Sequence, residues 1–475
     1  MACVLDPLFS EGQLSRLKDS IVSNSRLFQV AVDTKLDRYI VSKKFVLERH
    51  VYVEDLLLEL STKKGNLNEG QRLLSTKTPA DVVESLIGVS WVSGGIPGAL
   101  ACLKVLLPDI KWQSIDGARQ TLYDNAPPDI PLPRTLGPVE GLLGYTFKKK
   151  ALLIEALTHP SYNAPEGKDS PNFERLEFLG DTILDYIVVT KMFREIPGLE
   201  NAEMHVLQTA LVNGDILAFL CMELAVEEER VDPELVGRDY VDSDSTGNSD
   251  HEADEADRSG KNKRRRIDGE KAVQLKKSTV KHPLWSFMRH DSPEMGIVQR
   301  ATQERHAELR GGILAALQSG NEYPWAKLIR LQAQKFYSDI VESILGAVWV
   351  DSGDIEECSK VIERLGILPL MRRLLKDKVH LRHPKEELAI LAGAEKVKYG
   401  VEAKRTGEDN NDVTWAGWLY VGDRRIADVS GCVSKEEART RAAEHACTVL
   451  KVEKVMEKET GKERRRKEVR KRPIP

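Results

Sequence analysis

Apolar and acidic side chains follow a helical pattern along residues 174–184. At about 100° of rotation per residue, Glu174, Glu177 and Asp181 fall on one stripe of such a helix. Like charges three or four positions apart repel each other, so the stripe does not stabilise the helix by itself. The pattern therefore predicts a helix that is buried on one side and turns its acids toward a cation. The apolar residues on the opposite side are Leu176, Leu179, Ile183 and Leu184.

A second amphipathic helix is predicted at residues 335–350. Asp339 and Glu342 lie three positions apart in it and share one face. Carboxylate oxygens are the ligands that Mg²⁺ and Mn²⁺ favour. Two helices that turn their acids to a common cleft can hold one or two such ions, which activate water and stabilise the leaving oxygen of a phosphodiester. The core side of this helix would be Ile340, Ile344 and Val348.

Together these two segments resemble the signature elements of the ribonuclease III family, in an arrangement similar to the C-terminal part of fungal-type Dicer-like proteins. The resemblance rests on Glu-Arg-Leu-Glu-Phe-Leu-Gly-Asp-Thr-Ile-Leu at 174–184 and on the spaced acids downstream. It implies hydrolysis of double-stranded RNA with Mg²⁺ or Mn²⁺, in small-RNA production for gene silencing. By position, the implied catalytic metal ligands are Glu177, Asp181, Asp339 and Glu342, with Glu174 as an auxiliary ligand and Lys335 as a further catalytic residue.

Simpler interpretations exist for the same residues. The acids could form a solvated helix face, although the apolar flanks and the second matched segment disfavour this. For Lys335, an i, i+4 ion pair with Asp339 would be worth only about 0.3–0.5 kcal/mol. That interpretation is nearly as good as a role in stabilising transition-state charge.

The chain also contains an internal repeat. Residues 77–95 repeat residues 335–353, and residues 20–24 align with residues 209–213. The resemblance implies that the two copies pack as an internal pseudo-dimer in which each copy cuts one strand of the duplex. The first-copy counterparts of Lys335, Asp339 and Glu342 are Lys77, Asp81 and Glu84.

The first copy lacks the upstream acidic motif. Asp181 precedes Asn213 in the second copy, and the same distance before Asn24 falls ahead of Met1. We therefore expect one complete centre and one remnant site. Either the sequence is a fragment of a longer protein, which we favour, or it is a natural truncated form that cuts one strand. A homodimer of second domains, which would restore two complete centres, is a third alternative.

Residues 382–452 resemble a double-stranded RNA-binding domain. Pro384–Ala394 is predicted as a helix, and Ser434 with Glu437 fits a capping box at the start of a last helix. In that family, cations at the start of the last helix bind phosphates across the major groove. The predicted strands are Val397–Lys404, Thr414–Val421 and Arg425–Val433, which gives the order α-β-β-β-α.

The RNA-binding motif of this domain is only partly matched. Lys435 and Arg439 match two of its three basic positions, and Arg441 adds a nearby charge. Glu436 stands where a lysine is usual, and the loop at 407–412 is acidic. Both departures weaken the expected RNA affinity. A protein-contact module with the same fold is the alternative.

Charge and cysteine content limit the classes of protein to which the chain can belong. The net charge of −4 is segregated into an acidic stretch at Asp239–Asp257 and basic runs at Lys261–Arg266 and Lys462–Arg472. Duplex RNA needs only a local positive surface, so the whole-chain charge excludes little. The six cysteines lack metal-site spacing and predict reduced thiols in an intracellular protein, in the nucleus or the cytoplasm. No signal peptide and no membrane segment are expected.

The predicted fold is mainly α. It comprises two ribonuclease III helical domains as an internal pseudo-dimer, the first truncated at its N-terminus, and an α-β-β-β-α double-stranded RNA-binding domain. The implied function is a Mg²⁺-dependent endonuclease with one complete centre; the alternative is a non-catalytic RNA-binding or interaction protein derived from a Dicer fragment. The predicted boundaries are 1–115 for the first domain, 116–135 for a linker, 136–375 for the second domain with a low-complexity insertion at 231–320, 382–452 for the RNA-binding domain and 453–475 for a basic tail.

Overall fold

The structure is a computed structural model that describes residues 10–40, 50–52, 72–163, 171–233, 275–406 and 412–470. Residues 225–282 form one compact unit, and the rest of the chain forms another. As predicted, the fold is mainly α. Among the described residues, a sheet of more than two strands occurs only in the C-terminal domain.

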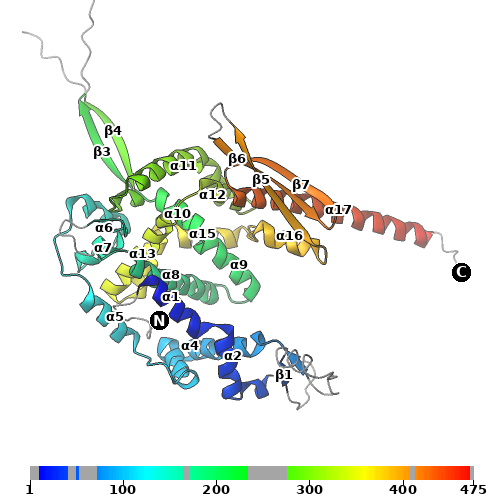
Figure 1. Ribbon diagram of the computed structural model, residues 1–475, viewed down its shortest axis with the longest axis horizontal. Coiled ribbons are helices and arrows are strands. Elements are labelled where there is room, and N and C mark those ends of the chain that lie inside the picture. Colours follow the sequence, from blue (N-terminus) through cyan, green and yellow to red (C-terminus); the bar gives the residue numbers. More distant parts are fainter. Residues whose placement is uncertain are drawn as a thin grey trace, which may run out of the picture. The chain divides into compact units, whose positions relative to one another are not determined.

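Two long helices form the centre of the second helical domain. α8 (Glu174–Glu195) and α13 (Phe336–Ser352) pack against each other, as Figure 1 shows. α13 is buried along almost its whole length because α7 (Lys150–Ala156) and α10 (Gly214–Glu223) also cover it. The other elements of this domain are η2 (Arg134–Leu136), α6 (Gly137–Leu143), α9 (Asn201–Val212), η3 (Leu284–Phe287), α11 (Pro293–Ser319), α12 (Trp325–Leu331), α14 (Ile355–Arg364) and α15 (Ile367–Lys376).

The first copy repeats part of this arrangement. α1 (Glu11–Val22), α2 (Asn24–Asp33) and α4 (Lys77–Leu106) follow one another as α9, α10 and α13 do. Ser23 caps α2 and Asn213 caps α10, so the break between helices falls at adjacent positions of the alignment. The copy has its own small core of Leu27, Val30, Ala31, Ala80, Val83, Leu106 and Leu107. Between α2 and α4 lie η1 (Leu36–Tyr39), β1 (His50–Tyr52) and β2 (Arg72–Leu74).

The two copies contact each other where α1 and α4 of the first meet α8 of the second. Trp91 of α4 packs edge-on against Tyr186 and Phe193, with ring centroids 6.3 Å apart in both pairs. Its indole nitrogen donates to the Tyr186 hydroxyl over 3.3 Å, and the Arg194 guanidinium lies 5.2 Å from its ring centroid. Such aromatic and cation–π contacts are worth about 0.5–1.5 kcal/mol each. They hold the predicted internal pseudo-dimer together.

α4 has an apolar surface that the sequence interpretation overlooked. By length and composition, it is the one helix in the described part of the chain that could cross a membrane alone, and the bent pair α9–α10 would be a second span. The expectation of no such segment missed the uncharged stretch at 85–103. α4 is broken at Gly94–Gly95, and its Val89 and Val92 are 61% and 57% exposed. The corresponding positions in α13 are buried, because α8 covers that helix.

The linker between the two copies is shorter than predicted. Part of the range 116–135 is α5 (Ile115–Asn125), a regular helix capped by Ser114. Arg119 of α5 donates to the carbonyl oxygens of Val350 and Asp351 over 2.8 and 2.9 Å. These bonds cap the C-terminal end of α13, so α5 belongs to the helical domain.

The insertion in the second domain is also narrower than the predicted 231–320. Leu284 of η3 and Ile313 of α11 are fully buried in the main core, so residues 284–319 are part of the helical domain. The separate unit at 225–282 contains β3 (Ala225–Pro233), which pairs with β4 (Leu275–Pro283). The acidic and basic runs that the sequence suggested between these strands lie outside the described residues.

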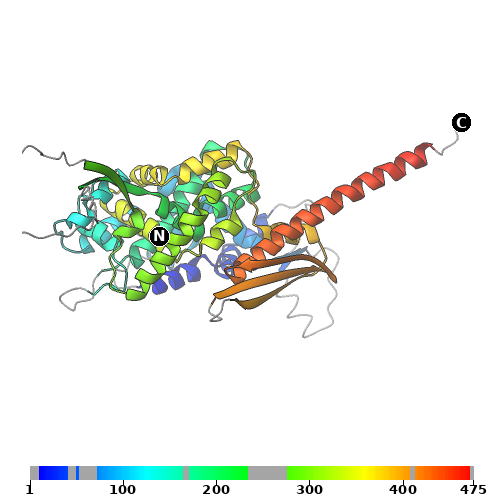
Figure 2. The same cartoon turned by 90° about the horizontal axis from the view of Figure 1, so that it is seen from above.

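The C-terminal domain has the predicted α-β-β-β-α order. α16 (Pro384–Ala392) and α17 (Lys435–Arg470) pack on one face of an antiparallel sheet of three strands. Alanines at 438, 442, 443 and 446 let α17 approach the sheet, and α17 continues well past the strands (Figure 2). The helix is therefore longer than predicted. The strands are β5 (Val397–Thr406), β6 (Asp412–Val421) and β7 (Arg424–Cys432).

Candidate active site

α8 and α13 approach so closely that only glycine fits where they cross. A Cβ atom on Gly180 would lie 2.9 Å from the backbone nitrogen of Gly346 and still closer to the carbonyl oxygen of Glu342. A Cβ atom on Gly346 would lie 3.0 Å from the carbonyl carbon of Leu176 and closer still to its oxygen. The two glycines therefore allow direct backbone contact. Acids that flank the crossing on either helix are brought together by it.

Three carboxylates meet beside this crossing. Glu177, Asp339 and Glu342 each offer an oxygen within 4.8 Å of the others. An all-oxygen donor set suits Mg²⁺ or Mn²⁺ better than softer metals. The predicted ligand Asp181 is not in this group of three, although its charge is close enough to raise the pKa of Glu342. Glu174 is exposed and also lies outside the group.

Lys335 joins two of these acids. Its ammonium donates a hydrogen bond to Glu177 and another, over 2.9 Å, to Asp339. Burial lowers the pKa of Lys335, but the hydrogen bonds to the two carboxylates raise it by more. The side chain is 73% exposed, so each ion pair contributes no more than about 1 kcal/mol. The i, i+4 pair expected from the sequence is present, together with a second pair that reaches from α13 to α8.

Two of these acids have strongly raised pKa values. Burial raises the pKa of Glu342 to about 9, and the charges of Asp181, Asp339 and Glu177 add to the effect. Burial also raises the pKa of Glu177 to about 7, partly offset by its hydrogen bond from Lys335. One ammonium cannot neutralise three carboxylates. A divalent cation would supply the missing positive charge, so the residues present fit such an ion.

This arrangement predicts that the stability of the metal-free protein depends on pH, and that Mg²⁺ removes this dependence. An acid with a higher pKa in the folded than in the unfolded chain binds more protons when folded, so the unfolding free energy of the metal-free protein falls as pH rises. For Glu342 the window runs from its ordinary value of 4.5 up to about 9. Denaturant unfolding in EDTA should show a loss of more than about 1 kcal/mol between pH 6 and pH 9.

Two variants test the origin of this slope. Glu342→Gln should remove the slope above about pH 7, because the amide cannot ionise and the pKa of Glu177 is raised only to about 7. Glu84→Gln, at the aligned and exposed position of the first copy, should leave it unchanged. A slope above pH 7 that survives Glu342→Gln, or a slope that Mg²⁺ does not reduce, would show that other groups cause it.

The first copy contributes a cation that the sequence interpretation missed. The ammonium of Lys18 on α1 lies 5.5 Å from the ring centroid of Phe178 on α8. Burial raises the pKa of Asp181, and the charge of Lys18 partly offsets that rise. Extending the repeat by two residues aligns Lys18 with the buried Leu207. The presence of a lysine where the second copy has a core leucine was the signal that could have identified Lys18 from the sequence.

The first copy itself holds only half a site among the described residues. Lys77 and Asp81 lie 4.0 Å apart, with side chains 69% and 50% exposed, and Glu84 is also exposed. No described acid joins them in a group of three. Gly88, which aligns with Gly346, has open space around it. The helix that would complete this site is not among the described residues.

The predicted RNA-binding residues differ in their surroundings. Lys435 is exposed at the start of α17, with its ammonium 4.9 Å from the Trp415 ring centroid, and Arg439 follows one turn later. Both therefore lie on the same side of the helix. Glu436, which stands where the family has a basic residue, forms an ion pair with Lys385. Its negative charge is thereby compensated locally. The acidic loop at 407–411 lies outside the described residues.

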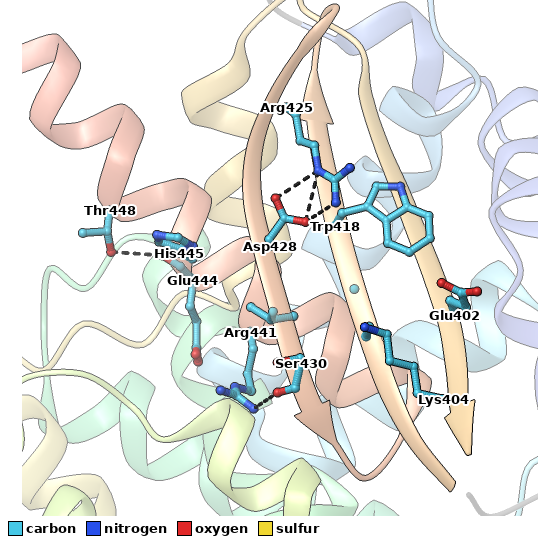
Figure 3. Close-up of a pocket in the computed structure, with 13 residues that line it drawn as sticks. Glu402, Lys404, Trp418, Arg425, Asp428, Ser430, Arg441, Glu444, His445 and Thr448 are labelled. Atoms are coloured by element: carbon cyan, nitrogen blue, oxygen red, sulfur yellow. Dashed lines mark hydrogen bonds and ion pairs between the residues drawn. The ribbon is translucent and has the colours of Figure 1, made fainter. Parts of the chain in front are cut away.

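Arg441 does not share this setting. It donates to the carbonyl oxygen of Ser430 over 3.4 Å and lies 3.6 Å from the buried Glu437. Figure 3 shows it beside a hollow of about 770 Å³ in the C-terminal domain. Positive and negative side chains alternate around that hollow, so it has no excess of positive charge for phosphates. Its charged members are Glu402, Lys404, Arg425, Asp428, Arg441 and Glu444.

A duplicated helical unit, buried carboxylates at a helix crossing and an α-β-β-β-α domain are together the features of ribonuclease III proteins. The sequence model of the ribonuclease III domain matches residues 3–95 and 174–353. The chain belongs to the ribonuclease III family. The model of the double-stranded RNA-binding domain of Dicer-like protein 2 matches residues 377–469.

The chain is similar over most of its length to fungal proteins named Dicer-like protein 2. It is 44% identical to that of Cryphonectria parasitica, over 93% of this chain and 29% of the relative. It is 42% identical to that of Pyricularia oryzae, over 92% and 28%, and 39% identical to that of Neurospora crassa, over 95% and 31%. The chain thus spans less than a third of the length of these relatives.

Proposed function

We propose that this chain is a Mg²⁺- or Mn²⁺-dependent endonuclease that cuts double-stranded RNA at one complete centre, within the small-RNA production of gene silencing. The observation that carries the proposal is the convergence of Glu177, Asp339 and Glu342 from two helices beside a glycine crossing. Buried carboxylates with raised pKa values are costly to keep, and a metal-dependent reaction gives them a purpose. The family membership and the RNA-binding domain supply the substrate class.

The side chains divide the work. Glu177, Asp339 and Glu342 would hold the ion, and the charge of the nearby Asp181 raises the pKa of Glu342. When bound, the divalent ion activates water and stabilises the departing oxygen of a phosphodiester. Lys335 keeps Glu177 and Asp339 in place through its two hydrogen bonds. Lys435 and Arg439 would contact phosphates of the same duplex away from the site.

A strand-resolved cleavage assay tests this function. Duplex RNA with a different label on each strand is incubated with the protein in Mg²⁺ or in EDTA. We expect cleavage in Mg²⁺ and none in EDTA. Each bound duplex should be cut in one strand, since one copy has the full set of acids. Binding without cleavage would favour a non-catalytic RNA-binding protein. Paired cuts in both strands, together with a doubled mass in solution, would indicate a homodimer of second domains.

A further inference from the structure

The turn between α12 and α13 carries Lys335 into the active site. It begins at Gln332, a non-glycine residue with φ of 46°, and Lys335 follows three positions later. From the helical domain, Arg305 of α11 holds this turn by donating to the carbonyl oxygens of Leu331 and Gln332 over 2.9 and 3.4 Å. A left-handed residue costs free energy and persists only when neighbours fix it.

The C-terminal domain holds the same turn from the other side. The Gln332 side chain donates to the carbonyl oxygen of Val433 over 3.0 Å. Arg330 donates to the carbonyl oxygen of Gly431 over 3.1 Å and to the Glu437 carboxylate over 2.9 Å. These acceptors lie at the end of β7 and the start of α17, within four residues of Lys435. One short segment therefore joins the RNA-binding end of α17 to the lysine of the active site.

Glu437 makes the contact between α12 and the C-terminal domain, here called the junction, costly to break. Its side chain is 1% exposed, and its other oxygen accepts from the Val433 backbone nitrogen over 2.6 Å. Loss of the Arg330 guanidinium would leave Arg441, 3.6 Å away, as the remaining described cation beside this buried carboxylate, which destabilises it. Trp325 supports the junction, since its ring centroid lies 4.9 Å from that of His383 and its indole donates to the Leu381 carbonyl oxygen over 3.0 Å.

We propose that Arg330 and Gln332 are positioning residues through which the C-terminal domain fixes Lys335 in the active site. Docking of that domain then controls the rate of the chemical step and not only RNA affinity. The inference rests on the proposed function, because the rate it concerns is that of RNA cleavage. Neither Arg330 nor Gln332 belongs to the cluster of three carboxylates. The C-terminal domain, whose fold indicates RNA binding, would thereby have a second role.

Arg330→Met tests the inference, because it keeps the aliphatic stem and removes the guanidinium. Lys327→Met is the matched control, since Lys327 is on the same helix and, among the described residues, its ammonium donates only to the Gly312 carbonyl oxygen over 3.3 Å. With saturating duplex RNA in Mg²⁺, we expect the single-turnover rate of Arg330→Met to fall about tenfold, equal to about 1.4 kcal/mol of lost coupling. The Kd for duplex RNA in EDTA should change less than about twofold. Arg330→Lys should restore part of the rate.

Hydrogen exchange gives a readout that does not depend on cleavage. Amides at 332–339 should exchange faster in Arg330→Met than in the wild type or Lys327→Met. Faster exchange with a lower rate supports the inference, whereas unchanged exchange, or a loss of RNA affinity alone, overturns it. If the wild type does not cut RNA at all, the proposed function fails, and exchange at 332–339 still decides whether the C-terminal domain holds this turn.

Discussion

Replacement of Asp339 by asparagine should abolish RNA cleavage and leave duplex binding almost unchanged. Asparagine keeps the shape of the side chain but removes one of the three charges that converge at the helix crossing. We expect the single-turnover rate in Mg²⁺ to fall at least about a hundredfold, as when one preorganised electrostatic group is lost. The Kd for duplex RNA, measured in EDTA, should stay within about twofold, because we expect affinity to come mainly from phosphate contacts of the C-terminal domain.

The internal repeat supplies the control for this experiment. Asp81→Asn makes the same change at the aligned position of the first copy, where the side chain is exposed. Cleavage by Asp81→Asn should equal that of the wild type. An equal loss of activity in both variants would place a working centre in the first copy. A loss of RNA binding in Asp339→Asn as large as its loss of cleavage would count against a catalytic role.

Periodicity was sufficient to predict which residues share a helix face. The spacing of Glu177 on one helix and of Asp339 and Glu342 on another indicated two acidic stripes, and those stripes meet. Periodicity cannot give the distance between two helices, which depends on the side chains at their contact. For this reason Glu174, although on the predicted stripe, lies in solvent, and Asp181 falls outside the group of three.

The errors in domain boundaries have a related cause. α11 fully buries only Thr302, Ile313 and Leu317 among its 27 residues, so its apolar residues gave no clear pattern that separates it from an insertion. α5 fully buries a single residue, Ala118, and is attached to the helical domain by half-buried apolar side chains and by the hydrogen bonds of Arg119. Elements with so few fully buried residues leave little signal in the order of apolar residues.

The two copies also show that one sequence pattern can have two environments. α4 and α13 share their spacing of small and apolar residues, yet α13 is enclosed by α8 while much of α4 is exposed. What differs is the partner helix, which no local pattern within α4 could reveal. The glycine at the crossing is the clearest example, because Gly346 is confined by backbone and Gly88 is not.

Replacement of Gly346 by alanine should therefore destabilise the protein and reduce cleavage together. The added methyl group would overlap the backbone of Leu176, and relief requires α8 and α13 to separate, at a cost of about 1–3 kcal/mol or more. Separation would also move Glu177 away from Asp339 and Glu342, so the metal would bind more weakly. Denaturant unfolding and the Mg²⁺ concentration needed for half-maximal cleavage measure the two effects.

Gly88→Ala is the matched control, because it makes the same change at the aligned position of α4, where nothing lies within 4 Å. Alanine in a helix interior is favoured over glycine by about 0.5–1 kcal/mol, so Gly88→Ala should be neutral or slightly stabilising and should cleave normally. The two substitutions would then change the free energy of unfolding in opposite directions, and the cause of the difference would be α8, which covers α13. Gly346→Ala could instead keep the stability and the Mg²⁺ dependence of the wild type. Close contact between the helices would then not be what brings the carboxylates together, and flexible side chains would have to bring them together instead.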